Sequence, residues 1–222
     1  MSSIMYSPRF DSRMGRALIR IKETPALKRV LDLTLTIPAL VFLSPALGVI
    51  ALLIKFHDRG PIFFRSVRIG KDGVPFKFLK FRTMVVNAEA LKAQLLHRNQ
   101  HGLSVTFKIK NDPRITPIGC ILRRWSLDEL PQLWNVLLGS MSLVGPRPAV
   151  PAEVARYTDF DRERLRVLPG ITCIWQVSGR SDVPFERQVL MDREYIEKQS
   201  LWTDLILLGK TVPAVFIGRG AY

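Results

Sequence analysis

The segment VLDLTLTIPALVFLSPALGVIALLIKF, residues 30–56, decides the architecture of this 222-residue chain. Between Arg29 and Lys55 it carries a single charged residue, Asp32. An α-helix needs roughly 20 apolar residues to cross a bilayer, so the segment is long enough to do so. A secretory signal peptide fits poorly, because a long basic segment precedes the run and no convincing cleavage site follows it. The segment therefore predicts a membrane helix attached to a domain built from the rest of the chain.

Two features indicate that this helix enters and leaves the membrane on the same face. Pro38 and Pro45 each remove a backbone donor and bend a helix, and the Ser44 hydroxyl is placed to satisfy a carbonyl that Pro45 leaves unbonded. The run is also flanked by cations at both ends: Lys28 and Arg29 before it, and Lys55, Arg59, Arg65 and Arg68 after it. The positive-inside rule places both flanks in the cytoplasm. A re-entrant helix broken at Ser44-Pro45 satisfies this rule, and a single-pass helix with a mild proline kink is the alternative.

The positive charge is concentrated in the first half of the chain. Of a formal net charge of +14, residues 1–125 carry 22 Lys and Arg against 7 Asp and Glu, whereas residues 126–222 carry 11 against 12. Basic residues beside an apolar run favour anionic lipid headgroups as the partner. Nucleic acid is not expected, because the aromatic residues of segment 76–82 are typical of a half-buried strand and not of a base-stacking surface. Two cysteines give neither a disulfide framework nor a zinc site.

The remaining sequence predicts a helix-rich α+β domain. Residues 60–84 indicate two short strands around a tight turn. Residues 184–217 are mostly helical in pattern, and their end is apolar enough to lie on a membrane. We therefore expect three parts: a basic arm over residues 1–27, a re-entrant membrane helix over 28–58, and a compact globular domain over 59–222. That domain faces the cytosol and carries amphipathic interfacial helices and a membrane-associated C-terminal helix.

The segment WSLDELPQLW, residues 125–134, places two carboxylates side by side. A capping box from Ser126 to Glu129 would explain them structurally, but Pro131 would then be the fifth helical residue, where it removes a needed donor. With Asp128 as N-cap, Pro131 takes the third helical position, where no donor is needed. We therefore expect a helix that begins at Asp128 and holds both carboxylates at its positive end. The second acid is either a solvated first-turn glutamate or part of a catalytic pair.

Two arginines favour the catalytic pair. The sequence GPRP places Arg147 on a proline-bracketed loop, where a rigid guanidinium can hold a phosphate or diphosphate. Arg123 lies five residues before Asp128 and is close enough to reach the same pocket. Such a set suits Mg²⁺-dependent phosphoryl transfer, and a carboxylate can also act as the nucleophile. The alternative is a non-enzymatic adaptor, anchored in the membrane, whose basic face over residues 55–82 binds anionic lipid or nucleic acid.

Several segments together resemble one family, the bacterial sugar transferases, and within it the monotopic polyprenyl-phosphate sugar-1-phosphate transferases, also called phosphoglycosyl transferases. The resemblance runs from about Lys28 to the C-terminus. It is carried by RRWSLDELPQLWNVLLGSMSLVGPRP at 123–148, PGITCIWQVSGRSD at 169–182, KRVLDL at 28–33, FKFLKFRTM at 76–84, NDPRIT at 111–116 and the Ser-Pro pair at 44–45.

This resemblance implies a reaction, a site and a cellular location. The enzyme would transfer a sugar-1-phosphate from a UDP-sugar to undecaprenyl phosphate and release UMP, as the initiating step of exopolysaccharide, capsule or O-antigen synthesis. Asp128 would be the nucleophile and form a covalent aspartyl-phosphosugar, and Glu129 would assist through Mg²⁺ or by proton transfer. Asp128 and Glu129 would be the metal ligands, and Arg147 and Arg123 would bind phosphate. The protein would lie on the cytoplasmic face of the bacterial inner membrane, and a homodimer is compatible with this.

The chain departs from the family pattern at three positions. Cys173 stands where Gly is usual, Ser140 where Asp is usual, and Cys120 where a basic residue is common. The form WQVSGR resembles members that transfer a hexose, which favours glucose or galactose. Larger members carry an additional N-terminal region, so this chain resembles the minimal catalytic unit.

Overall fold

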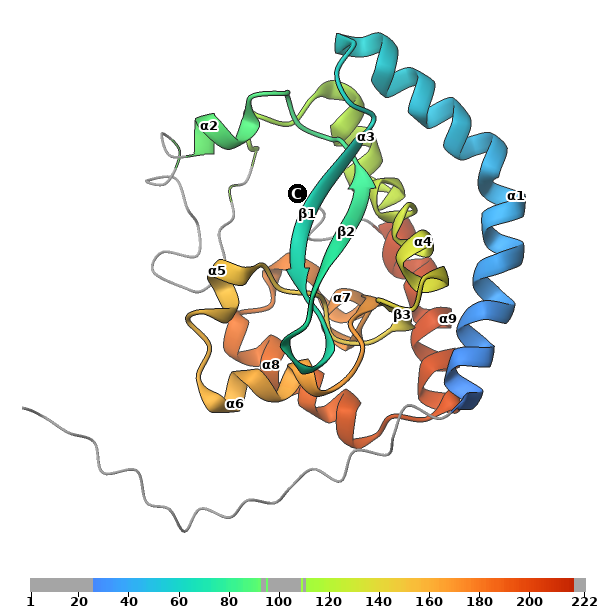
Figure 1. Ribbon diagram of the computed structural model, residues 1–222, viewed down its shortest axis with the longest axis vertical. Coiled ribbons are helices and arrows are strands. Elements are labelled where there is room, and N and C mark those ends of the chain that lie inside the picture. Colours follow the sequence, from blue (N-terminus) through green and yellow to red (C-terminus); the bar gives the residue numbers. More distant parts are fainter. Residues whose placement is uncertain (1–25, 93–94, 96–108, 110, 218–222) are drawn as a thin grey trace, which may run out of the picture.

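A computed structural model describes residues 26–92, 95, 109 and 111–217. The predicted basic arm therefore lies almost wholly outside the described residues. Figure 1 shows a helix-rich α+β domain with one long apolar helix along its side, as the sequence predicts. In chain order the elements are α1 (Ala26–Asp58), β1 (Phe63–Ile69), η1 (Lys71–Gly73), β2 (Pro75–Phe81), α2 (Ala88–Lys92), α3 (Pro117–Arg124), η3 (Leu127–Glu129), α4 (Gln132–Leu137), β3 (Ser142–Val144), α5 (Pro151–Val154), α6 (Asp159–Arg162), η4 (Glu163–Arg166), β4 (Gly170–Thr172), α7 (Ile174–Ser178), η5 (Arg180–Asp182), α8 (Phe185–Glu197) and α9 (Leu201–Ile217).

Helix α1 is continuous through both of its prolines, so it is bent rather than broken at the Ser-Pro pair. Pro45 cannot donate to the carbonyl of Val41, and the Ser44 hydroxyl donates to that carbonyl instead, at 2.8 Å. This is the hydrogen bond that the sequence leads one to expect. Figure 1 shows α1 curving around the domain. Among the described residues, α1 is the one helix whose length and composition would allow it to cross a membrane.

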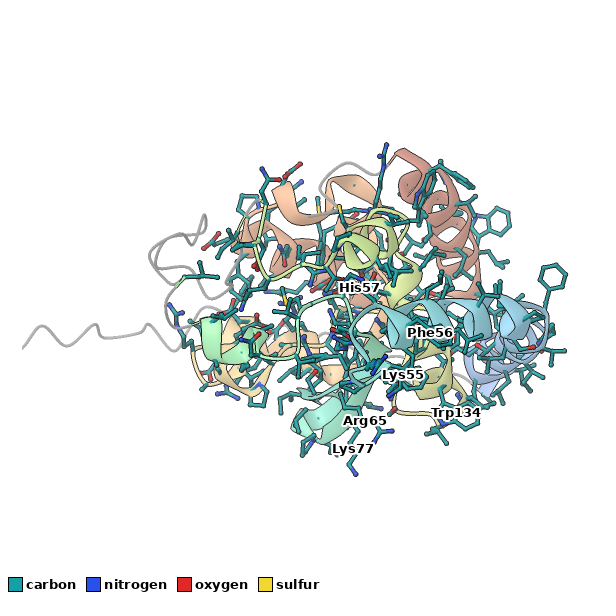
Figure 2. All side chains as sticks on the ribbon, turned by 90° about the horizontal axis from the view of Figure 1, so that it is seen from above. Lys55, Phe56, His57, Arg65, Lys77 and Trp134 are labelled. Carbon is teal, nitrogen blue, oxygen red and sulfur yellow. The ribbon has the colours of Figure 1, made fainter. Side chains whose placement is uncertain are left out.

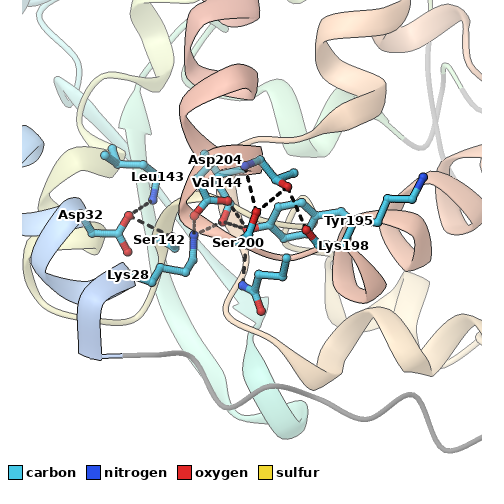
Figure 3. A network of polar contacts seen from close by, with 11 residues as sticks. Lys28, Asp32, Ser142, Leu143, Val144, Tyr195, Lys198, Ser200 and Asp204 are labelled. Atoms are coloured by element: carbon cyan, nitrogen blue, oxygen red, sulfur yellow. Dashed lines mark hydrogen bonds and ion pairs between the residues drawn. The ribbon is translucent and has the colours of Figure 1, made fainter.

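The N-terminal end of α1 is bound to the domain by buried polar contacts, which Figure 3 shows. The Lys28 ammonium pairs with the Asp204 carboxylate of α9 and donates to the carbonyl of Val144 at 3.0 Å. The Asp32 carboxylate accepts from the Ser142 hydroxyl and from the backbone N–H of Leu143, both at 3.0 Å. The single charge within the apolar run is thus a structural anchor.

The C-terminal end of α1 is bound to the same domain. Arg82, which follows β2, forms a two-pronged ion pair with Asp58, the last residue of α1. Ile50 and Ile54 pack in a small core with Phe81 of β2. The middle of the helix instead exposes large apolar side chains, among them Phe42, which is 85% exposed.

Strands β1 and β2 form the predicted antiparallel hairpin, in which Arg68 is opposite Phe76 and Phe64 is opposite Lys80. Because side chains alternate between the two faces of a strand, Arg68 and Lys80 share the face that looks into the domain. Arg65 and Lys77 lie on the other face, and Figure 2 shows them pointing away from the body of the domain.

A second, parallel pair of strands fixes the loop of residues 145–149, which contains the GPRP sequence. β3 pairs with β4 through Ser142 opposite Gly170, and the N–H of Gly170 donates to the carbonyl of Pro146 at 2.9 Å. A side chain at Gly170 would place its Cβ 2.0 Å from the backbone nitrogen of Gly145, so glycine is required there. The main core lies beside this pair and includes Phe78, Val136, Met141, Val144, Val167 and Tyr195.

Candidate active site

The two carboxylates, the hairpin and the 145–149 loop meet at a cavity of about 640 Å³. Its polar wall is strongly cationic. The basic side chains that line it are Arg68, Lys80, Arg114, Arg123, Arg147, Arg164 and Arg180, whereas its acidic side chains are Asp112, Asp128, Glu129 and Glu153. A cavity with this balance of charge is suited to phosphorylated ligands.

The backbone around Asp128 and Glu129 adopts neither of the two helix starts that the sequence suggests, one capped by Ser126 and one by Asp128. Leu127–Glu129 form a single turn of 3₁₀-helix, and α4 begins only at Gln132, so the prediction of a helix that begins at Asp128 is wrong. Pro131 has no N–H for the carbonyl of Leu127, and that carbonyl accepts from Leu130 in a 3₁₀ bond instead. Ser126 has φ 53°, in the left-handed region, and its side chain makes no cap, so the capping box is absent as well.

Asp128 is almost buried, with 5% of its surface exposed. Its closest cation is the Lys80 ammonium, whose Nζ lies 3.9 Å from Oδ2 of Asp128. Burial raises the pKa of Asp128 above its ordinary value, and the positive charge of Lys80 opposes that rise. Burial also lowers the pKa of Lys80 to about 8, against the opposing attraction of Asp128. The two groups therefore stabilise one another's charge in a partly dehydrated site.

Glu129 has a different partner, although it is the next residue. Nη1 of Arg147 donates to Oε1 of Glu129 at 2.8 Å. Burial disfavours the charged form of Glu129, but the charge and the hydrogen bond of Arg147 outweigh it, and the pKa of Glu129 is lowered. The same carboxylate raises the pKa of Arg147. Glu129 is thus held ionised and oriented, whereas no cation in the described part of the chain is hydrogen-bonded to Asp128, which remains available to a ligand.

Arg123 reaches the cavity from α3, as its spacing from Asp128 predicts. Its Nε donates to the hydroxyl of Thr83 at 2.9 Å, which fixes the guanidinium near the carboxylates. Burial lowers the pKa of Arg123, with Asp128 acting in the opposite direction. The structure therefore brings Asp128, Glu129, Arg147 and Arg123 to one cavity.

The sequence did not identify five further cations of this cavity as site residues: Arg68, Lys80, Arg114, Arg164 and Arg180. Arg68 was assigned to the basic flank of the membrane helix, but it lines the cavity instead and donates to the carbonyl of Pro148 at 3.1 Å. Burial lowers the pKa of Arg68 to about 10. Lys80 was interpreted as part of a half-buried strand and of the basic face over residues 55–82, and Arg114, Arg164 and Arg180 were not assigned to the site. The signal for the first two was available, because an antiparallel hairpin places residues 68 and 80 on the same face.

The site offers a limited set of ligands for a divalent cation. No group of three His, Cys, Asp or Glu side chains gathers anywhere in the described part of the chain. Mg²⁺ is commonly bound by one or two carboxylates, with water and substrate phosphates completing the octahedron. Asp128 and Glu129 fit that pattern, because both face the cavity and the cationic wall holds space for phosphate.

A long apolar helix on a small α+β domain, whose cavity joins two carboxylates to a cationic wall, defines a membrane-associated transferase of phosphorylated substrates. The family follows from comparison with known proteins. Residues 23–218 match the model of the bacterial sugar transferase family, and the chain belongs to that family.

Relatives of two sizes match the chain. It is 43% identical over 198 residues to the exopolysaccharide production protein ExoY of Sinorhizobium fredii, which covers 88% of each chain. It is 44% identical over 215 residues to the undecaprenyl-phosphate galactose phosphotransferase of Salmonella typhimurium, covering 92% of this chain and 45% of that one. It is 38% identical over 234 residues to the UDP-glucose:undecaprenyl-phosphate glucose-1-phosphate transferase of Escherichia coli, covering 99% of this chain and 48% of that one.

The three departures from the family pattern lie outside the wall of this cavity. Cys173 is fully buried with an extended backbone, and its thiol donates to Oε1 of Gln176, a lining residue, at 3.1 Å. Ser140 bonds to Asn135, and Cys120 is exposed on α3. Of the three, Cys173 is best placed to influence the cavity, because it contacts one of its lining residues.

Proposed function

We propose that this protein transfers a sugar-1-phosphate from a UDP-sugar to undecaprenyl phosphate and releases UMP, in the initiating step of exopolysaccharide synthesis. The observation that carries the proposal is the unequal environment of the two carboxylates. Glu129 is bound by Arg147, whereas Asp128 lies at the wall of a cationic cavity with the Lys80 ammonium 3.9 Å from its carboxylate. The names of the Salmonella and Escherichia relatives describe this type of transfer with galactose and glucose. Either hexose is the donor we expect here.

The proposed reaction proceeds in two displacements at phosphorus. A carboxylate oxygen of Asp128 attacks the phosphorus that carries the sugar, the bond to the bridging oxygen breaks, and UMP leaves with that oxygen. A phosphate oxygen of undecaprenyl phosphate then attacks the same phosphorus, and the bond to Asp128 breaks. The products are undecaprenyl diphosphate sugar and the free carboxylate, so the aspartyl-phosphosugar is the covalent intermediate.

The surrounding residues have separate roles in this scheme. Partial dehydration of Asp128 strengthens every interaction of its charge inside the cavity, and Lys80 keeps the carboxylate ionised. Arg123 and Arg147 neutralise the charge of the diphosphate and of the departing UMP. Glu129 orients Arg147, and Glu129 and Asp128 are the residues that would hold Mg²⁺. When bound, Mg²⁺ would supply further charge neutralisation to the diphosphate.

We also propose that α1 is re-entrant and that the domain lies on the cytoplasmic face of the inner membrane. Support comes from the two ends of α1, which are held by the same domain through Lys28 and Asp58. A helix that crossed the bilayer would carry one end roughly 30 Å away, on the other side of the hydrocarbon core. Exposed Phe56 and Trp134 with the cations Lys55, Arg65 and Lys77 (Figure 2) form a surface of the kind that contacts anionic headgroups.

The test of the activity is UMP release from a panel of UDP-sugars by purified protein in nanodiscs, with Mg²⁺ and undecaprenyl phosphate. Asp128→Asn should lower the rate at least about 10³-fold, the order expected when a nucleophile is removed, and still co-sediment with membranes. The matched control is Asp161→Asn, which changes a carboxylate that caps α6 and does not line the cavity. Near-normal release by Asp128→Asn would refute the nucleophile. Silence of the parent protein with every sugar would favour the adaptor alternative.

Topology has its own test, which is cysteine labelling from outside intact cells. A cysteine introduced before residue 28 and one introduced after residue 60 should both stay unlabelled by an impermeant reagent. Labelling of the first with none of the second would establish a true membrane span.

A further inference from the structure

The lining of the catalytic cavity also contains apolar side chains, which contrast with the cations around Asp128. These apolar side chains include Met84, Trp125, Leu127, Leu130, Ala214 and Val215. The donor is a nucleotide sugar with no need of such a surface. An apolar lining beside a cationic wall fits a ligand that is charged at one end and hydrocarbon at the other.

Helix α9 separates this apolar lining from the outside of the molecule. Thr211, Ala214 and Val215 line the cavity and lie one turn apart on the same face. Val212 and Phe216 are on the outward face and are 58% and 68% exposed. The wall at this place is therefore a single helix thick.

Trp125 stands at the border between the cavity and the outer apolar surface. It lines the cavity, is 38% exposed, and meets Phe216 edge-on with ring centroids 5.8 Å apart. On α3, one turn earlier, Ile121 is 60% exposed. The contact between Trp125 and Phe216 is thus the junction of α3 and the C-terminal half of α9.

The apolar surface continues from this junction towards the membrane helix. The outward residues of α9 include Trp202, Leu205 and Ile206, which are 72%, 44% and 41% exposed. The first turn of α9 is joined to α1 by the ion pair of Asp204 with Lys28, and Figure 1 shows α9 beside that end of α1. An apolar path therefore leads from the membrane helix along α9 to the mouth of the catalytic cavity.

We propose that the isoprenoid chain of the acceptor passes between α3 and α9, across Trp125 and Phe216, while its phosphate reaches Asp128. This rests on the proposed function and names the acceptor subsite within it. Each buried CH₂ of a lipid chain contributes about 0.8 kcal/mol, so a long isoprenoid cannot reach the carboxylates through water. It must stay in apolar contact from the bilayer to the cavity, and this junction provides that contact next to a cationic wall.

The test compares Trp125→Ala and Ala214→Phe with the control Phe160→Ala, which removes an exposed aromatic of α6 that is not part of this path. Each variant is assayed with undecaprenyl phosphate and with a short, water-soluble isoprenyl phosphate. Trp125→Ala removes contact with the chain, and Ala214→Phe fills the passage. We expect the KM for undecaprenyl phosphate to rise about tenfold in both, which corresponds to 1.4 kcal/mol, with little change for the short acceptor and none in the control.

The outcomes separate the passage from the proposed function. An unchanged KM for the long acceptor, an equal loss with both acceptors, or an equal loss in the Phe160→Ala control would each overturn the passage. UMP release without any acceptor measures the donor step alone. If the parent protein released no UMP, the proposed function would be refuted instead. In that case a photoreactive polyprenyl phosphate still tests the passage. Its cross-links should map to residues 125 and 214–216. Undecaprenyl phosphate should prevent these cross-links, whereas bilayer phospholipid should not. Cross-links elsewhere would overturn the proposal.

Discussion

The ion pair of Lys28 with Asp204 should carry much of the attachment of α1 to the domain. The two residues are 2% and 1% exposed, and they join positions that are 176 residues apart in the sequence. Asp204→Asn keeps the shape of the side chain but removes its negative charge, so the buried Lys28 ammonium is left with neutral acceptors such as the Val144 carbonyl. Removing one member of a buried pair costs about 3–5 kcal/mol, because the other charge is left uncompensated.

This loss should be visible as a lower midpoint of thermal unfolding. For a chain of this size each kcal/mol shifts Tm by roughly 2–4 °C, so we expect a fall on the order of 6–20 °C. Unfolding would be followed by tryptophan fluorescence in detergent micelles. Trypsin provides a second readout, since cleavage after Lys28 should become faster when that end of α1 is released.

Two control variants test whether the buried ion pair anchors α1. Glu194→Gln removes a carboxylate from the exposed pair with Lys198 and should leave Tm unchanged, because exposed pairs contribute little. The double variant Lys28→Met with Asp204→Asn should recover part of the loss, since no charge is then left alone. If Asp204→Asn behaved like Glu194→Gln, the buried pair would not be the anchor of α1.

Three further outcomes follow from the geometry. Burial lowers the pKa of Lys80 to about 8, so Lys80 loses its charge as the pH rises through that value and kcat/KM should fall there. Lys80→Arg should move this alkaline limb of the pH–rate profile to higher pH. An unmoved limb would exclude Lys80 as its source. Gly170→Ala should lower the free energy of unfolding by roughly 3 kcal/mol, because its Cβ would collide with backbone, whereas a Cβ at Gly209 meets nothing within 4 Å. Equal stabilities of Gly170→Ala and Gly209→Ala in urea unfolding would contradict this. Maleimide should label exposed Cys120 in the folded protein and leave Cys173 unlabelled, because burial raises the pKa of the Cys173 thiol well above its ordinary value. Mass spectrometry of the labelled peptides would show which cysteine has reacted.

Local patterns in the sequence predicted the elements whose form depends on neighbours in the chain. The alternation of residues 63–81 around a tight turn gave the hairpin, and the apolar run gave the long helix. The Ser44 hydroxyl was expected to satisfy a carbonyl freed by Pro45, and it does so because that carbonyl is only three residues away. The start of a helix at Asp128 was predicted wrongly, since a 3₁₀ turn satisfies the Leu127 carbonyl without needing an N–H from Pro131.

The sequence by itself also determined the kinds of group in the site: an adjacent acid pair, a proline-bracketed arginine and a second arginine five residues before Asp128. Only the tertiary structure decided their partners, pairing Glu129 with Arg147 and Asp128 with Lys80. It also placed Arg68 in the wall of the cavity instead of beside the membrane, and it bound both ends of α1 to one domain. The physical reason is distance along the chain. Turns and periodicity are set by residues a few positions apart, whereas these charges meet across 18 to 176 residues and only after the core has packed.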